Sequence, residues 1–263
     1  MATHDYVIDN STGANVRSDL NNVLQAILTN NSSGSAPSTT AAYMLWADTS
    51  NNLLKMRNSA NDDWISLRTL TGGITSAADA TINSVTVGKG ANSVATNTAL
   101  GVSALTSATT GVRNTAIGSG TLDALTTADN NVAIGDQALG ANTTGSNNVA
   151  IGRNAMIVST GADNNTAVGR SALQQNAAGN NTAVGRDALA ANTTGTRNVA
   201  VGANALDANT TASDNNAFGN NALGANTTGT RNTAVGYQAL KANTTSDDNT
   251  AVGRQALLAN TTG

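Results

Sequence analysis

Small, amide and larger apolar residues recur in a fixed order from residue 97 to residue 263. Each copy reads Asn, a variable residue, Ala, a larger apolar residue and Gly, as at 97–101 and 232–236. Successive glycines are 17 residues apart, except for one step of 16 between Gly169 and Gly185. A short period over ten copies predicts a solenoid, because one repeat cannot bury its own apolar side chains and must stack on its neighbours.

Two kinds of side chain alternate within each copy. With the glycine as position 0, position −4 is always Asn, position −2 is always Ala and position −1 is always a larger apolar residue. Alternate residues of a strand face opposite sides, so positions −4 and −2 predict one face and positions −3 and −1 the other. We expect the asparagines at position −4 to form a structural ladder of stacked amides; they are Asn97, Asn114, Asn131, Asn148, Asn165, Asn181, Asn198, Asn215, Asn232 and Asn249.

A second apolar element follows the glycine. Position +3 is Ala and position +4 is Leu in nine copies each, with Thr121 and Met156 as the exceptions. A polar corner follows, which is Asn-Thr-Thr-Gly in its fullest form, and such residues favour turns. We therefore expect two short strands and two turns per coil, and an all-β parallel β-roll of ten coils over residues 97–263.

Residues 1–72 have a different pattern. Apolar residues at helical spacing predict a short helix over residues 14–29, whose narrow stripe packs either on its own domain or on a partner helix. Three apolar runs within residues 42–68, separated by turn residues, predict a three-stranded antiparallel sheet. The prediction for residues 1–72 is therefore a small α+β region, and residues 73–96 form a transition segment.

Two features of these N-terminal segments could bind ligands. The tryptophans Trp46 and Trp64 both fall in the predicted sheet; an aromatic pair can bind sugar, but we expect these two to form the small core of the sheet. Gly88-Lys89-Gly90 resembles a fragment of a phosphate-binding loop. The spacing and the following helix of such a loop are lacking, so we assign it no nucleotide role.

The composition excludes several function classes. The chain has no cysteine, one histidine, 11% charged and 2% aromatic residues, and a net charge of −3. Thiolate chemistry is therefore excluded, and attraction to nucleic acid or to an anionic membrane is not expected. We find no catalytic constellation, cofactor motif or metal-ligand spacing and expect a protein that is not an enzyme. We also expect no export signal and no membrane insertion.

Charged residues recur on the repeat in two places. Arg153, Arg170 and Arg186 occupy position +1 in three successive coils, so we consider them a candidate contact for an anionic receptor group such as a polysaccharide carboxylate or phosphate. Solvated arginines that fan apart are the alternative. Aspartates and arginines of the polar corner mostly alternate along the chain, for which we favour charge pairing between coils over metal binding.

The small apolar content of each coil predicts self-association. One Val or Ile and one Leu are the only large apolar groups that most coils offer. The free energy gained by burying them must outweigh the conformational entropy lost when a whole coil is ordered. If the second apolar face of the strand is covered by further copies of the chain, the balance improves. We therefore expect an oligomer wound about the axis of the roll.

Two resemblances extend this interpretation. Asn-x-Ala-Val-Gly resembles the head repeat of trimeric autotransporter adhesins, whose fold is a trimer of left-handed parallel β-rolls with shorter coils. The longer form at 232–245, Asn-Thr-Ala-Val-Gly-Tyr-Gln-Ala-Leu and then Asn-Thr-Thr, is similar to repeats in tail fibres of marine and cyanobacterial phages. Residues 5–10 and 45–58 resemble the start of such fibres.

The phage resemblance implies a structural homotrimer that is made in the host cytoplasm and incorporated into the virion. Its N-terminal region would attach to a tail or adaptor protein, and its distal part would contact a polysaccharide or protein of the host surface. We favour it over the adhesin because an autotransporter needs a signal peptide and a membrane barrel, which we do not find in this sequence. The alternative is the head of a bacterial trimeric surface adhesin.

Overall fold

The structure, a computed structural model, describes residues 35–36, 44–69, 79–82, 84–91 and 94–261. The chain forms two compact units, Met1–Ala78 and Asp79–Gly263. Every helix or strand within the described residues is a β-strand, so the fold is all-β there. The helix expected over residues 14–29 lies outside the described residues.

The first unit contains a three-stranded antiparallel sheet, as predicted. It consists of β1 (Leu45–Asp48), β2 (Leu53–Arg57) and β3 (Trp64–Thr69), in the order β1-β2-β3. The rings of Trp46 and Trp64 pack edge to face with centroids 5.2 Å apart, and Trp46 is buried. The tryptophan pair therefore forms the core of the sheet.

A buried carboxylate fixes one end of this sheet. Asp48 has no exposed surface and lies 2.8 Å from the ammonium group of Lys55, while Ser50 and Asn51 also donate hydrogen bonds to it. Burial acts to raise the pKa of Asp48, but these donors outweigh it and hold the pKa well below its usual range. The carboxylate therefore stays charged and paired.

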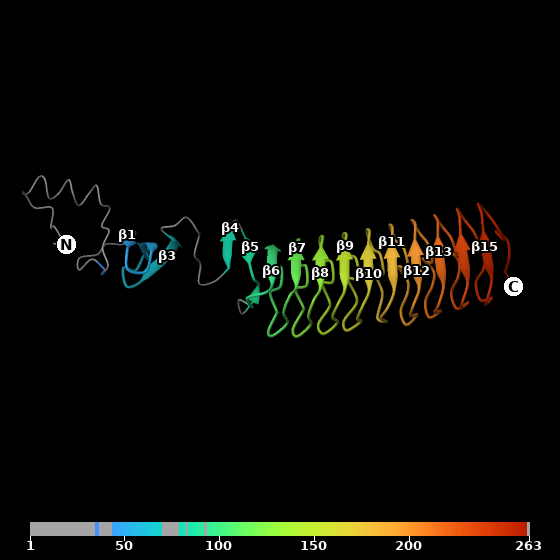
Figure 1. Ribbon diagram of the computed structural model, residues 1–263, viewed down its shortest axis with the longest axis horizontal. Coiled ribbons are helices and arrows are strands. Elements are labelled where there is room, and N and C mark those ends of the chain that lie inside the picture. Colours follow the sequence, from blue (N-terminus) through green and yellow to red (C-terminus); the bar gives the residue numbers. More distant parts are fainter. Residues whose placement is uncertain (1–34, 37–43, 70–78, 83, 92–93, 262–263) are drawn as a thin grey trace, which may run out of the picture. The chain divides into compact units, whose positions relative to one another are not determined.

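The second unit is a solenoid built on one twelve-stranded sheet (Figure 1). It begins with β4 (Ala80–Ile82) and β5 (Val85–Gly88), and β5 pairs antiparallel with β6. From β6 onward all pairs are parallel and in register, so each alanine at position −2 is paired with the next one. The strands are β6 (Thr98–Gly101), β7 (Thr115–Ile117), β8 (Val132–Ile134), β9 (Val149–Ile151), β10 (Thr166–Val168), β11 (Thr182–Val184), β12 (Val199–Val201), β13 (Asn216–Phe218), β14 (Thr233–Val235) and β15 (Thr250–Val252).

These ten parallel strands bound nine full coils of about 17 residues, which confirms the parallel solenoid predicted from the period. The two faces of the strand also separate as predicted. Asn131 and Ala133 of one coil are buried, whereas Val132 and Ile134 lie on the outer side and keep part of their surface exposed. The core is therefore inside each coil, and the larger apolar residues of the strand lie outside it.

The prediction of a second strand in each coil is wrong. Between β6 and β15, each coil of residues 94–261 has one strand and a run of turns. Gln137 and Leu139, at positions +2 and +4, have left-handed backbone with φ of 57° and 51°, and the same pattern recurs in the other coils. The reason is that Ala138 and Leu139 are both fully buried. A strand sends adjacent side chains to opposite faces, so only a turn can direct both inward.

The turns still join the coils by backbone hydrogen bonds. The N–H of Gln137 donates to the carbonyl of Ser119 in the preceding coil at 2.8 Å, and the N–H of Leu139 donates to Ala155 in the following coil at 3.0 Å. Each turn thus binds both neighbours. These bonds offset the cost of left-handed backbone, which is about 1–2 kcal/mol for a residue such as Leu.

Two columns of asparagine lie in the interior. The inner asparagine column is position −4, and the corner asparagine column, at position +7, was not predicted; its fully buried members are Asn142, Asn176, Asn192, Asn209, Asn226 and Asn243. Asn131 and Asn142, one from each column, both donate from Nδ2 to the carbonyl of Gly145, at 2.9 and 2.8 Å. The two columns therefore meet at the corner and close the coil.

Both columns also bond along the axis. In the inner column the N–H of Asn148 donates to Oδ1 of Asn131 at 2.9 Å, so the side chain binds the backbone of the next coil. In the corner column Nδ2 of Asn209 donates to Oδ1 of Asn192 at 2.9 Å. In the coils that carry both asparagines, the amide groups thus link neighbouring coils as well as closing the coil itself.

The glycine at position 0 is required by close contact between coils. Gly185 has a φ of 140°, and a Cβ added to it would lie 2.5 Å from the carbonyl oxygen of Gly202 in the next coil. That oxygen belongs to the backbone and cannot move aside without shifting the coil. Replacement of Gly185 by Ala should therefore push two coils apart.

We expect Gly185→Ala to lower the free energy of unfolding by more than about 1 kcal/mol, since the new residue would have both a strained φ and a clash. Gly140→Ala is the matched control. A Cβ on Gly140 would lie 3.4 Å from its nearest neighbours, and Ala190 occupies the same position in another coil. Urea denaturation followed by circular dichroism measures both; equal midpoints would contradict the close-contact explanation.

We expect Asn209→Ala to cost about 1–3 kcal/mol, because it leaves buried partners without hydrogen bonds. Asn209 donates to Asn192 and to the carbonyl of Ala212, and it accepts from Asn226. The control is Thr211→Ala, two residues away and exposed, for which the change should stay within about 0.5 kcal/mol. The same denaturation experiment would disprove the role of the corner asparagine column if the two variants were equally stable.

Candidate interaction surface

The outer apolar column runs along the strand face of the solenoid. It consists of the residues at position −1: Leu100, Ile117, Ile134, Ile151, Val168, Val184, Val201, Phe218, Val235 and Val252. Ile151, Val184 and Val235 are 36–37% exposed, and Leu100 and Phe218 are 42% exposed. Because the strands are parallel and in register (Figure 1), these side chains form one continuous apolar strip.

The turn that follows the strand carries the three arginines considered as an anion contact. Arg153, Arg170 and Arg186 are exposed at position +1 of successive coils. All three are paired with carboxylates: Arg153 lies 3.5 Å from Asp136, and Arg170 and Arg186 lie 3.1 and 2.6 Å from Asp187. The cluster thus carries a net charge of only +1, and its guanidinium donors are partly used.

The two carboxylates of this cluster were not recognised in the sequence, although a signal for them exists. Asp136 occupies position +1 of the coil before Arg153, and Asp187 is the residue directly after Arg186. Side chains at positions +1 and +2 of neighbouring coils lie within reach of one another. A search of both columns would have shown that every arginine of the cluster has an acidic neighbour.

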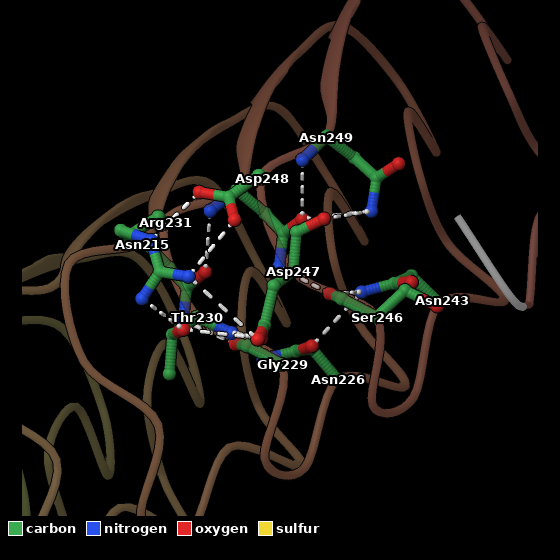
Figure 2. Close-up of polar contacts among 11 residues, drawn as sticks. Asn215, Asn226, Gly229, Thr230, Arg231, Asn243, Ser246, Asp247, Asp248 and Asn249 are labelled. Carbon is green, nitrogen blue, oxygen red and sulfur yellow. Dashed lines mark hydrogen bonds and ion pairs between the residues drawn. The ribbon is translucent and has the colours of Figure 1, made fainter.

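A second charged region lies at the polar corner, where residues 197, 214, 231 and 248 of four successive coils are alternately arginine and aspartate. Figure 2 shows the pair of Arg231 and Asp248. Arg197 binds Asp214 through two hydrogen bonds of 2.6 and 2.9 Å, and Arg231 binds Asp248 through two of 2.7 and 2.8 Å. The charge pairing predicted for the corner is confirmed for these coils. All four side chains are at least 40% exposed, so the pairs contribute little to stability.

In the C-terminal half, the residue types at the corner repeat every two coils. Gly195 and Gly229 alternate with Ala212 and Ser246 at position +10. A Cβ on Gly195 or Gly229 would collide with the carbonyl oxygen of the next residue in this column. The coils with glycine carry arginine two residues later and the others carry aspartate, so the ion pairs join the coils two by two.

The carboxyl groups of this corner titrate below their ordinary range. Hydrogen bonds from Arg231 lower the pKa of Asp248, and those from Arg197 lower the pKa of Asp214. The pKa of Asp247 is lowered first by the backbone N–H of Thr230, which donates to it at 2.6 Å (Figure 2). These lowered values stabilise the folded state above the unfolded pKa of the carboxyl groups, and the contribution is lost as the pH falls through the folded values.

The Gly88-Lys89-Gly90 segment does present backbone N–H groups to an anion, but the anion belongs to the chain. The carboxylate of Asp79 accepts the N–H of Lys89 at 2.6 Å and the N–H of Gly90 at 2.5 Å. A Cβ on Gly88 would overlap this carboxylate. The donors that a phosphate would need are therefore occupied by Asp79.

No group of three or more His, Cys, Asp or Glu side chains within the described residues could hold a metal ion. No helix in that part of the chain is long and apolar enough to cross a membrane. No family model, no curated protein and no solved structure matches the chain.

We expect Arg231→Ala to raise the pKa of Asp248 toward its ordinary value of 3.8, because the variant lacks the guanidinium that stabilises the carboxylate. The pKa of Asp214 serves as an internal control, since it is lowered mainly by Arg197 and should change less. NMR titration of the carboxyl carbons measures both values. An unchanged pKa of Asp248 would show that the pair does not persist in solution.

Proposed function

We propose that the protein is the shaft of an adhesive fibre of the phage tail-fibre kind, and that it functions as a homotrimer. The observation that carries this proposal is the outer apolar column. Monomeric proteins rarely expose long contiguous apolar surfaces. The column crosses ten stacked strands, which at about 4.8 Å a step corresponds to roughly 45 Å of apolar surface.

The geometry of the column suits association of identical copies side by side. Every coil repeats the same register, so two or more parallel copies can meet with the same residues opposite at each level. Closed cyclic symmetry then covers the strip on every chain. The interior of each coil holds mainly alanine, leucine and asparagine, so the large residues outside add apolar burial that one chain lacks.

A fibre role follows from how the solenoid is held together. Hydrogen bonds join each coil to the next along the strand, the turns and both asparagine columns, which favours a stiff element that transmits position and force. The repeat and the N-terminal segments resemble phage tail fibres. We propose accordingly that the N-terminal region attaches the trimer to a tail or adaptor protein and that the solenoid presents variable outer columns to a host-surface polysaccharide or protein.

The trimer can be tested by native mass spectrometry and by light scattering at micromolar concentration. We expect three copies for the natural chain and single copies for the double variant Ile151→Asp, Val184→Asp, because it places charges within the apolar contact. The control is Val158→Asp. Val158 is 46% exposed but lies at position +6, away from the strand face, so this variant should remain trimeric.

A monodisperse monomer of the natural chain would contradict the proposal, and so would dissociation by Val158→Asp alone. The role in the fibre is tested separately, by imaging virions with a label on this chain. A label along the tail fibres is the expected result, and a label elsewhere would leave the bacterial adhesin as the better hypothesis.

A further inference from the structure

Arg254 differs from every other arginine of the solenoid. Within residues 94–261, Arg113, Arg153, Arg170, Arg186, Arg197 and Arg231 each lie within 4.0 Å of a carboxylate. Arg254 is the one arginine of this range without such an ion pair. Its guanidinium lies over the ring of Tyr237 instead, 5.6 Å from the ring centre.

Two places that hold a carboxylate beside the other arginines hold neutral side chains beside Arg254. Arg153 binds a carboxylate at position +1 of the preceding coil, Arg170 one at position +2 of the following coil, and Arg186 one at position +2 of its own coil. For Arg254 the first and the last of these places are held by Tyr237 and Gln255. A cation–π contact orients the guanidinium but uses none of its five N–H donors, so those donors remain able to bind an anion.

Two glutamines occupy position +2 in the coil of Arg254 and in the preceding coil. Nε2 of Gln255 donates to Oε1 of Gln238 at 3.1 Å, which holds two amides side by side across neighbouring coils. In the coil before Tyr237 and Gln238, positions +1 and +2 are Asn220 and Asn221. Across these three coils positions +1 and +2 contain no carboxylate.

An exposed aromatic surface lies next to these donors. Tyr237 is 43% exposed and Phe218 is 42% exposed, and they are the only aromatic residues in the printed sequence from residue 97 onward. They lie in adjacent coils, since the N–H of Gly236, directly before Tyr237, donates to the carbonyl of Phe218 at 2.7 Å. Aromatic rings and oriented planar donors thus occur together at one place on the rod.

We propose that this Arg254 edge, made of Tyr237, Gln238, Arg254 and Gln255, binds a carboxylated sugar of a surface polysaccharide. The guanidinium would bind the carboxylate through two parallel hydrogen bonds. The Tyr237 ring would contact the apolar face of the sugar, and the glutamine amides would bind its hydroxyl groups. The inference rests on the proposed role in surface recognition and names the ligand class and the residues that bind it.

The experiment measures binding of defined oligomers of galacturonate, mannuronate and hyaluronate to the chain of residues 1–263 by isothermal titration calorimetry, with a neutral galactan oligomer beside them. We expect at least one acidic oligomer to bind more tightly than the neutral one. Arg254→Ala should weaken that binding by about tenfold or more, and Arg254→Lys, which keeps the charge but loses the planar pair of donors, by less. Tyr237→Ala should also weaken it.

Arg170→Ala is the matched control, because Arg170 occupies the same position in another coil but is paired with Asp187; its effect should stay within about twofold. Thermal unfolding of each variant shows that it is folded. The proposal is overturned if no acidic oligomer binds at millimolar concentration, if the neutral oligomer binds equally well, or if Arg254→Ala is no worse than Arg170→Ala. Binding is measured in solution, so a monomeric chain that binds would reject only the trimer, and a trimer that does not bind would reject only this site.

Discussion

In five coils of residues 94–261 the corner depends on one shared acceptor, the backbone carbonyl at position +10. In a typical coil this is the carbonyl of Gly145, which receives Nδ2 of Asn131 from the start of the coil and Nδ2 of Asn142 from the corner itself. A coil this thin has little apolar material to bury, and an unpaired carbonyl in its interior would cost about 1–3 kcal/mol. The two asparagines remove that cost and fix the distance across the coil. Stacking then follows, because closed coils of equal size place their strands in register.

This arrangement separates the residues that hold the fold from those that can vary. The inward positions are restricted to Asn, Ala and Leu with few exceptions, and glycine is required where the carbonyl of the next coil approaches, as at Gly185. Outward positions of the turn carry no such restriction, although the outer apolar column at position −1 is apolar in every copy. At position +1 the chain has Asp136, three paired arginines and then Tyr237 and Arg254. Chemical differences along the rod are therefore found on its surface columns, while the interior repeats almost unchanged.

Three features were predicted from the sequence: the parallel register of the solenoid, the separation of Asn and Ala from the larger apolar residues on the two faces of the strand, and the small antiparallel sheet around Trp46 and Trp64. They depend on the period and on local patterns of alternation and turn residues. The prediction of a second strand was wrong because the adjacent apolar residues Ala138 and Leu139 were interpreted as part of a strand. Both side chains are buried, and the backbone there makes left-handed turns. The corner asparagine column was missed because the asparagine of Asn-Thr-Thr-Gly was interpreted only as a residue that favours a turn. The acidic partners of the arginine cluster were missed since they lie one coil or one residue away, which a reading of single columns does not reveal.

The outer apolar column and the Arg254 edge are neighbours that need not compete for the same surface. Val235 and Tyr237 are separated by Gly236, whose φ of 134° turns the chain at the end of the strand. The strand face can therefore be covered by other copies while the turn remains at the rim of the assembly. Phe218 belongs to the covered column, and its ring would then support the contact between chains beside the edge rather than bind sugar itself. Assembly on one column and recognition on the next would place a copy of the edge on each chain of a trimer, and three weak sites at one level of the rod gain from multivalent binding to a repeating polysaccharide.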